Sequence, residues 1–300
     1  MLKSIHFLLS YKCNRSCDHC FVFSGPQARG TFTLEQIRRV LDEIPRVGSI
    51  EGIYFEGGEP FLFYPIMVEG IRIARGMGLK AGVVTNAYWA TSPEDAEFWL
   101  RPLAELGLTG PTLSDDLFHH AEEEADPAQL ALAAARKLGM APTTICTAPP
   151  RVETGQDGAP AVTGGVMFRG RAAEKLAEGM PTRPWTSFAA CTSEDLRNPA
   201  RVHVDAYGNV HLCQGLLMGN MWTTPLSELV AGYDPDAHPV VGPLLAGGPT
   251  RLAEAAGIEH EAEYISACHL CYSVRKALLG RFPCELGPRQ VYGLAPDEKG

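Results

Sequence analysis

Residues 5–20 read I-H-F-L-L-S-Y-K-C-N-R-S-C-D-H-C. The apolar run Ile5–Leu9 predicts a buried strand, and three cysteines in the spacing C-x3-C-x2-C follow it directly, at positions 13, 17 and 20. Three thiolates on one short loop can hold a metal centre, but they are one ligand short of the four that a [4Fe–4S] cluster usually takes. We therefore predict a metal centre with one open coordination position, which is typical of a reactive site rather than a structural one.

The composition is that of a soluble globular protein. The chain has 300 residues, of which 45% are apolar and 20% are charged, and this length allows one large domain and a smaller one. No apolar stretch approaches the ~20 residues of a membrane span, and the N-terminus lacks the apolar core of a signal peptide, so we expect a cytoplasmic protein. The net charge of −9 without a Lys/Arg block favours neither a nucleic acid nor an anionic membrane as a partner. Nine cysteines then indicate metal or redox chemistry rather than disulfides.

Short apolar runs alternate with helical patterns over residues 1–180, as expected of parallel βα units. Thr33 and Gln36 match a capping box and predict a helix start, and Ser92 before Pro93 predicts a second one. Six such units predict an α/β fold, a partial (β/α)6 barrel of the TIM type rather than a closed eight-fold barrel. The predicted strands cover residues 5–9, 50–55, 81–85, 108–113, 142–147 and 162–168, and the helices begin near 34, 66, 93 and 127.

The pattern changes after residue 180, and we expect a small C-terminal domain over residues 181–300 in which a β-hairpin and a helix carry cysteines. Residues 201–212 alternate around the turn Gly208-Asn209 and predict the hairpin. Residues 232–249 are rich in Gly and Pro and predict a loop, whereas Cys268–Leu279 predicts the helix. In the first part of the chain, the acidic run Glu122–Glu124 is expected to be a solvated face.

Polar residues follow the predicted strands. Gly57-Gly58-Glu59-Pro60 comes after the second strand, Asn86 after the third and Ser114-Asp115-Asp116 after the fourth. Because reactive groups of parallel βα folds collect at the carboxyl ends of the strands, these residues should rim the same end of the sheet as the cysteine loop. The paired glycines let a ligand approach the backbone closely, and a carboxylate beside them can receive an amine.

At these residues the chain resembles the radical S-adenosylmethionine (SAM) superfamily. The resemblance is carried by Cys13, Cys17 and Cys20 and by the segment Gly57-Gly58-Glu59-Pro60. It implies that the three cysteines hold a [4Fe–4S] cluster, that SAM chelates the fourth iron through its amine and carboxylate, and that the Gly-Gly-Glu segment contacts that amine. One electron from the cluster then breaks a C–S bond of SAM, and the resulting 5′-deoxyadenosyl radical takes a hydrogen from the substrate.

The resemblance also implies further contacts to SAM. The residue before the third cysteine is usually aromatic and lies beside the adenine, and here it is His19. His119 and His120 follow the fourth strand and are candidate proton acceptors near the same rim. The other expected SAM contacts are Asn86, Ser114 and Asp116 at the ribose or methionine portion and Arg169 or Arg171 at the carboxylate.

Two other interpretations of the triplet stay open. C-x2-C spacing also occurs in structural zinc sites, in which His19 or a remote residue would be the fourth ligand. A non-enzymatic iron–sulfur electron carrier would use similar cysteines, but it would not need the Gly-Gly-Glu-Pro segment and would not cleave SAM.

The later cysteines resemble the auxiliary-cluster extension of radical SAM enzymes, in its shorter twitch form or its longer SPASM form. The resemblance assigns four ligands to a second [4Fe–4S] cluster: Cys191, Cys213, Cys268 and Cys271. The chain departs from the SPASM pattern because only Cys284 follows Cys271 and position 277 is Ala. A zinc site or a ligand set that includes Cys284 stays open. Cys284, or else Cys146, is also a candidate hydrogen-atom donor of an epimerase.

The substrate is expected to be a natural product or a short peptide that is oxidised or epimerised. A peptide maturase of the SPASM type that forms a cross-link is the alternative. Because the first strand begins almost at the N-terminus, we expect no peptide-recognition domain ahead of it. The expected partner is an electron donor such as flavodoxin or ferredoxin.

Overall fold

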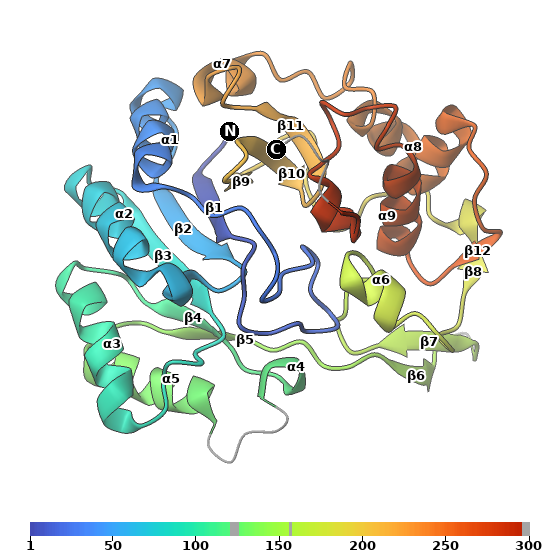
Figure 1. The fold of residues 1–300 in the computed structure, drawn as a ribbon. Helices are drawn as coiled ribbons and strands as arrows, with labels where there is room; N and C mark the ends of the chain where they lie inside the picture. Colours follow the sequence, from blue (N-terminus) through green and yellow to red (C-terminus); the bar gives the residue numbers. More distant parts are fainter. Residues whose placement is uncertain (121–125, 156–157, 296–300) are drawn as a thin grey trace.

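The computed structural model describes residues 1–120, 126–155 and 158–295. An eight-stranded sheet with the order β11-β10-β9-β1-β2-β3-β4-β5 forms its centre, and helices cover its outer side (Figure 1). This arrangement confirms the α/β class. The acidic run at 122–124 lies outside the described residues. The first part of the sheet and its helices are β1 (Ser4–Ser10), α1 (Leu34–Val47), β2 (Gly52–Gly57), α2 (Tyr64–Gly76), β3 (Lys80–Thr85), α3 (Pro93–Glu105), β4 (Pro111–Ser114), α4 (Leu117–His120), α5 (Pro127–Lys137) and β5 (Thr143–Ile145).

Both helix starts that the sequence predicts are confirmed. Thr33 Oγ1 accepts the N–H of Gln36 at 3.2 Å, and the Gln36 side chain accepts the N–H of Thr33 at 2.9 Å, which completes the capping box of α1. Ser92 caps α3 in the same way through the N–H of Asp95. These caps fix where the two helices leave the loops that follow β1 and β3.

The prediction of a sixth barrel strand at 162–168 is wrong. The short strands β6 (Arg151–Thr154) and β7 (Pro160–Thr163) pair with each other in a separate antiparallel sheet. The sixth parallel strand is β9 (Arg201–Asp205), which pairs with the free edge of β1. The physical reason is burial: β7 is largely exposed, whereas Val202 and Val204 of β9 are fully buried in the same core as Ile5.

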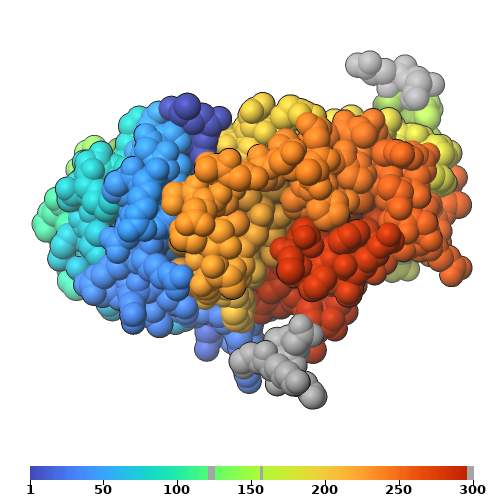
Figure 2. Space-filling view, turned by 90° about the horizontal axis from the view of Figure 1, so that it is seen from above, coloured from blue at the N-terminus to red at the C-terminus, as the bar shows by residue number. Residues whose placement is uncertain are grey.

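The C-terminal part continues the sheet and adds a second core. The predicted hairpin is confirmed as β9 and β10 (Asn209–Cys213), and β11 (Leu216–Asn220) extends it. Figure 2 shows this part, in orange, beside the blue N-terminal helices, and α7 (Leu226–Ala231) packs against α1. The second core lies between the carboxyl-terminal half of β1 and the helices α8 (Val241–Ala256) and α9 (Ala267–Ala277). The remaining elements are η1 (Pro60–Phe63), α6 (Arg171–Lys175), β8 (Arg183–Pro184), η2 (Trp185–Ser187), α7 (Leu226–Ala231), α8 (Val241–Ala256), β12 (Glu263–Tyr264), α9 (Ala267–Ala277) and η3 (Arg289–Tyr292).

The loop predicted for residues 232–249 is wrong from Val241 onward, where α8 begins. Buried Val241 and Leu244 give this stretch an apolar helical face, which outweighs its glycines and proline. The glycines instead produce a kink, because Gly248 adopts φ +65° and a Cβ there would lie 2.2 Å from Ala190 N. The helix predicted at 268–279 is confirmed as α9. In the described part of the chain, no helix has the length and apolar character needed to cross a bilayer.

Candidate active site

The cysteine loop leaves the carboxyl end of β1 and folds back on itself. Lys12 pairs with Gly25, and Cys13 N–H donates to the carbonyl of Gly25 at 3.1 Å. Backbone N–H groups also approach two thiols: Arg15 N lies 3.4 Å from Cys13 Sγ, and Ser24 N lies 3.3 Å from Cys20 Sγ. The loop therefore presents sulfur atoms that already accept hydrogen bonds, as sulfur ligands of iron–sulfur clusters do.

Two of these thiols, those of Cys13 and Cys17, are poorly suited to remain as free thiolates. Burial raises the pKa of Cys13 to about 11. Burial, together with the neighbouring thiols Cys20 and Cys13, raises the pKa of Cys17 to about 12. Deprotonated sulfur at these positions needs a compensating positive centre, and a bound metal supplies one.

The glycine pair at the end of β2 lies directly under the cysteine loop. A Cβ on Gly58 would lie 2.0 Å from the carbonyl oxygen of Lys12, and a Cβ on Gly57, at φ +124°, would lie 2.5 Å from that of Ser10. Gly58 N–H donates to Ser10 O at 2.6 Å, and Glu59 N–H donates to Lys12 O at 3.0 Å. Glycine is therefore required at both positions because the backbone of the cysteine loop packs directly against them. This requirement is separate from any contact of the glycines with a ligand.

Glu59 is fully buried, and both of its oxygens are occupied. Oε1 accepts from Thr85 Oγ1 at 2.8 Å and from Phe61 N at 3.0 Å, and Oε2 accepts from Asn86 N at 2.8 Å. Burial raises the pKa of this carboxyl to about 7, although the hydrogen bonds oppose the shift. Glu59 does not line the cavity described next, so its contribution to a ligand site is to hold the ends of β2 and β3 together. Pro60 begins η1 behind it.

A cavity of about 250 Å³ lies where the cysteine loop and the strand ends meet. Most of the residues that sequence analysis expected at one rim line it together. They are Cys13, Cys17, His19, Cys20, Gly57, Gly58, Asn86, Ser114, Asp116 and His119. Asn86 is tied to the loop, because its Nδ2 donates to Asn14 Oδ1 at 2.9 Å and lies 3.7 Å from Cys13 Sγ.

Two imidazoles, those of His19 and His119, line the cavity. His19 lies 4.4 Å from the ring of Phe118 and 5.2 Å from that of His119, measured between ring centres. Burial, aided by the charge of His119, lowers the pKa of His19 to about 4, so this ring is neutral at pH 7. His119 Nδ1 lies 2.8 Å from Asp116 Oδ1, and although burial opposes ionisation of Asp116, this contact holds the pKa of the carboxyl below its usual value. His120 is held by a contact to the carbonyl of Ser114 at 2.7 Å.

The spacing of the cysteines differs from that of a single-ion site. Among the residues that the structure describes, two groups of His and carboxylate side chains bring three ligand atoms within 4.8 Å of one another, and neither cysteine set does so. A tetrahedral zinc ion with Zn–S bonds of about 2.3 Å needs sulfur atoms roughly 3.8 Å apart. The triplet therefore fits a larger, multi-atom cluster better than one zinc ion.

A second small cavity gathers the later cysteines. Its lining includes Cys191, Cys213, Cys268 and Cys271, which come from the loop after η2, the end of β10 and the start of α9. Burial raises the pKa of Cys271 to about 12 and raises that of Cys268.

Buried arginines lie against this second set. Arg169 Nη1 lies 2.9 Å from Cys213 Sγ. Arg275 lines the same cavity, is 2% exposed, and forms no ion pair with a carboxylate in the described ranges. A buried guanidinium without a carboxylate partner is costly. Thiolates bound to a metal would supply the missing negative charge.

Some residues expected at the site lie elsewhere. Arg169 belongs to the second cysteine cavity, and Arg171 donates to the carbonyls of Cys17 at 2.7 Å and Ser24 at 2.6 Å, outside the lining of the first cavity. Neither arginine lines the first cavity, and residues 164–168 do not form the predicted strand ahead of them. A contact of either arginine with the SAM carboxylate therefore stays a prediction. Cys284 and Cys146 are exposed and do not line the cavity either, which does not support a hydrogen-donor role.

Sequence analysis missed two lining residues that carry charge, Arg15 and Glu56. Glu56 precedes the glycine pair and lines the cavity, and its carboxylate contacts the imidazoles of His6 and His203. The alternation of side chains between the two faces of β1 places His6 on the face opposite to Ile5 and Phe7, and this could be predicted from the sequence. The position of His203 beside it could not be predicted in this way, because it depends on the pairing of β9 with β1.

Comparisons with known proteins agree with this geometry. A family model described as the radical SAM superfamily matches residues 7–157. Over 117 residues, 39% of this chain and 37% of the relative, the sequence is 29% identical to "Putative peptide biosynthesis protein YydG" of Bacillus subtilis (strain 168). Over 80 residues, 27% of this chain and 17% of the relative, it is 32% identical to "Antilisterial bacteriocin subtilosin biosynthesis protein AlbA" of the same organism. The matches thus span well under half the length of these relatives.

A solved structure extends the comparison to the fold. "BtrN in complex with AdoMet and 2-DOIA" superposes with a TM-score of 0.50 at 17% identity, over 76% of this chain and 82% of that one. At this identity the likeness concerns the fold, which is the partial barrel described above.

Proposed function

The chain belongs to the radical SAM superfamily, and we propose that it is an enzyme that cleaves SAM reductively and removes a hydrogen atom from a peptide or other natural-product substrate. The observation that carries this proposal is the convergence of Cys13, Cys17 and Cys20 on the cavity that Gly57 and Gly58 also line. Three cysteines leave one position of a cluster open, and the adjoining cavity gives a ligand access to it.

The residues present fit a [4Fe–4S] cluster and SAM. The three thiols would hold the cluster, the backbone around Gly57 would face the methionine portion, and the neutral ring of His19 would lie beside the adenine. When bound, these groups supply the electron that cleaves SAM and the 5′-deoxyadenosyl radical that removes the hydrogen atom. The chain's own contribution would be to hold the three thiols on one loop and to enclose the reacting atoms between that loop and the strand ends.

The second cysteine set supports an auxiliary cluster. Cys191, Cys213, Cys268 and Cys271 would ligate it fully, and Arg169 and Arg275 would balance its negative charge. A fully ligated centre has no vacancy for a substrate, so it would accept an electron or stabilise the fold. A C-terminal twitch-like domain over 181–300 is part of this proposal.

The substrate class is proposed from the relatives. YydG and AlbA are named for the biosynthesis of a peptide and of a bacteriocin, which favours a short peptide over a sugar-like compound. We propose oxidation or epimerisation as the outcome, with flavodoxin or ferredoxin as the electron donor.

One experiment tests the reaction. The full chain is reconstituted anaerobically with iron and sulfide, mixed with SAM and dithionite, and assayed for 5′-deoxyadenosine by mass spectrometry. We expect product from the wild type and none from C17A, with C146A as the matched cysteine control. A wild type that carries clusters but yields no 5′-deoxyadenosine would instead identify an electron carrier.

A second measurement separates the outcomes. Incubation with candidate peptides in deuterated water gives deuterium at a stereocentre if the enzyme epimerises, and a loss of two mass units if it oxidises.

A further inference from the structure

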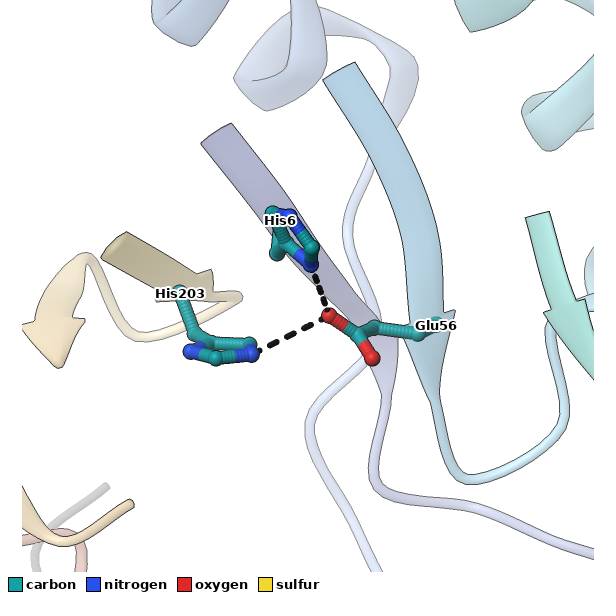
Figure 3. A group of neighbouring side chains, drawn as sticks. All are labelled: His6, Glu56 and His203. Atoms are coloured by element: carbon teal, nitrogen blue, oxygen red, sulfur yellow. Dashed lines mark hydrogen bonds and ion pairs between the residues drawn. The ribbon is translucent and has the colours of Figure 1, made fainter. Parts of the chain in front are cut away.

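Three titratable side chains meet on the inner face of the sheet, outside the cysteine sites. His6 on β1 is in register with His203 on β9 and with Tyr54 on β2, and Glu56 follows two residues after Tyr54. Because successive side chains alternate across a strand, these residues all face the inside of the barrel, while Ile5 and Val202 face the outer helices. Figure 3 shows the three side chains pointing toward one another from three strands.

The contacts within this group are short and converge on one atom. His6 Nδ1 lies 2.6 Å and His203 Nε2 lies 3.1 Å from Glu56 Oε1. Figure 3 shows both contacts reaching the same oxygen, while the second oxygen of Glu56 points away from the rings. The side chains are 17%, 7% and 17% exposed for His6, His203 and Glu56, so the group is largely shielded from bulk water.

The charge of the group is unbalanced. Burial opposes the ionisation of Glu56, but the charge and hydrogen bonds of His203 and then His6 outweigh it and hold the pKa of the carboxyl below its usual range. Burial lowers the pKa of His203, which favours the neutral imidazole. Within the described ranges, neither Lys nor Arg forms an ion pair with Glu56. An ionised carboxylate beside two imidazole nitrogens in a shielded site, with no Lys or Arg partner in the described ranges, attracts a cation.

The rings are also held in place. Tyr54 stacks on His6 with ring centres 4.5 Å apart, and Gly82 makes room for it, since a Cβ there would lie 2.4 Å from the Tyr54 ring. Gln214, which is 4% exposed, places its amide 3.4 Å from His203 Nε2, and its Oε1 is buried without a hydrogen-bond partner.

We propose that His6, Glu56 and His203 bind a divalent transition-metal ion of the zinc class inside the barrel. The three ligand atoms lie within 4.8 Å of one another. Two imidazole nitrogens with one carboxylate oxygen are the donor set of catalytic zinc and of non-haem ferrous iron, both of which keep an open position. Magnesium and calcium are disfavoured because they prefer oxygen ligands.

The open position would face the cavity that Glu56 lines together with the cysteine triplet. Water, or a carbonyl or hydroxyl oxygen of a ligand in that cavity, would complete the coordination and be polarised by the ion. This site is distinct from both cysteine sites, and the inference stands whether or not the chain cleaves SAM.

The test measures zinc in the cluster-loaded full chain. The wild type, E56Q and H203Q are reconstituted anaerobically, equilibrated with Zn²⁺ and freed of excess metal by gel filtration, and their zinc, iron and sulfide are determined. We expect about one zinc per wild-type chain and about a tenth of that or less in both variants. E105Q, at an exposed helix position, is the matched control and should retain the wild-type amount.

Either of two zinc contents would overturn the proposal. One is a wild type that binds no zinc under these conditions, a result that does not depend on whether the variants fold. The other is zinc that persists in E56Q at the wild-type level. X-ray absorption at the zinc edge provides a second readout: nitrogen and oxygen ligands alone support the site, whereas sulfur ligands would place the zinc in a cysteine site and contradict it.

Discussion

The buried carboxylate of Glu59 accepts a hydrogen bond from Thr85 Oγ1 at 2.8 Å, and this bond joins the end of β2 to the end of β3. The second oxygen of Glu59 accepts the N–H of Asn86, which in turn reaches Asn14 in the cysteine loop. Glu59 thus holds the strand ends at the rim of the cavity without lining the cavity itself. Its ionisation should therefore change the free energy of unfolding.

Stability should fall as pH rises through the range in which Glu59 ionises. Burial raises the pKa of this carboxyl to about 7 in the folded protein, whereas an unfolded glutamate titrates near 4.3. The folded state therefore binds the proton more tightly, so its contribution is complete below about pH 4.3 and is lost as pH rises to about 7. We expect on the order of 3 kcal/mol across this window, measured by urea denaturation of the cluster-free chain.

E59Q removes the titration and should flatten that part of the profile. E105Q, at an exposed position, should keep the wild-type slope. An unchanged slope in E59Q would show that another group causes the pH dependence.

G58A should displace the cysteine loop. The added Cβ would meet the Lys12 carbonyl at 2.0 Å, and this backbone atom can move only with the loop. We expect a loss of about 1–3 kcal/mol of stability and at least about tenfold weaker SAM binding, equivalent to ~1.4 kcal/mol, measured by thermal denaturation and equilibrium dialysis. G76A, where nothing lies within 4 Å at the end of α2, is the control and should be neutral or stabilising. Wild-type SAM affinity in G58A would contradict the close contact.

The elements that were predicted correctly are determined by residues close together in the sequence. The capping box at Thr33 and Gln36, for example, lies within four residues and fixes the start of α1. The pairing of β9 with β1 joins Val202 to Ile5 across most of the chain, and no local pattern encodes it. The predicted sixth strand at 162–168 failed for that reason: the alternation near Val162 belongs to an exposed hairpin rather than to the barrel.

The same distinction applies to the site. Cys13, Cys17 and Cys20 share one loop, so their spacing alone predicted a shared centre. Arg169 and Arg171 were assigned from the mistaken strand, and the fold places Arg169 at the second cysteine cavity instead. The group of His6, Glu56 and His203 exists only because distant strands become neighbours, which a single sequence does not reveal.

Each of the two cysteine sets should account for about half of the iron that the reconstituted chain binds. C13A removes one ligand of the cavity triplet, whereas C271A removes one ligand of the second set. If each set holds one [4Fe–4S] cluster, iron should fall from about eight to about four atoms per chain in either variant. Only C13A should also abolish cleavage of SAM. Equal iron in wild type and C271A would show that the second set holds no iron.

The last prediction concerns the buried charge of Arg275 beside the second cysteine set. Its Nη1 donates to the Gln214 carbonyl at 3.0 Å, and Cys271 is one turn before it on α9. Reduction adds negative charge to a cluster, and a nearby guanidinium stabilises that charge. R275M should therefore lower the midpoint potential of the second cluster. A loss of about 1 kcal/mol corresponds to roughly 40 mV for one electron, measured by a redox titration followed by electron paramagnetic resonance. R275K keeps the charge and should recover most of the shift, while SAM cleavage at the first cluster should stay unchanged in both variants. If R275M and R275K lower the potential equally, packing around α9 rather than charge sets it.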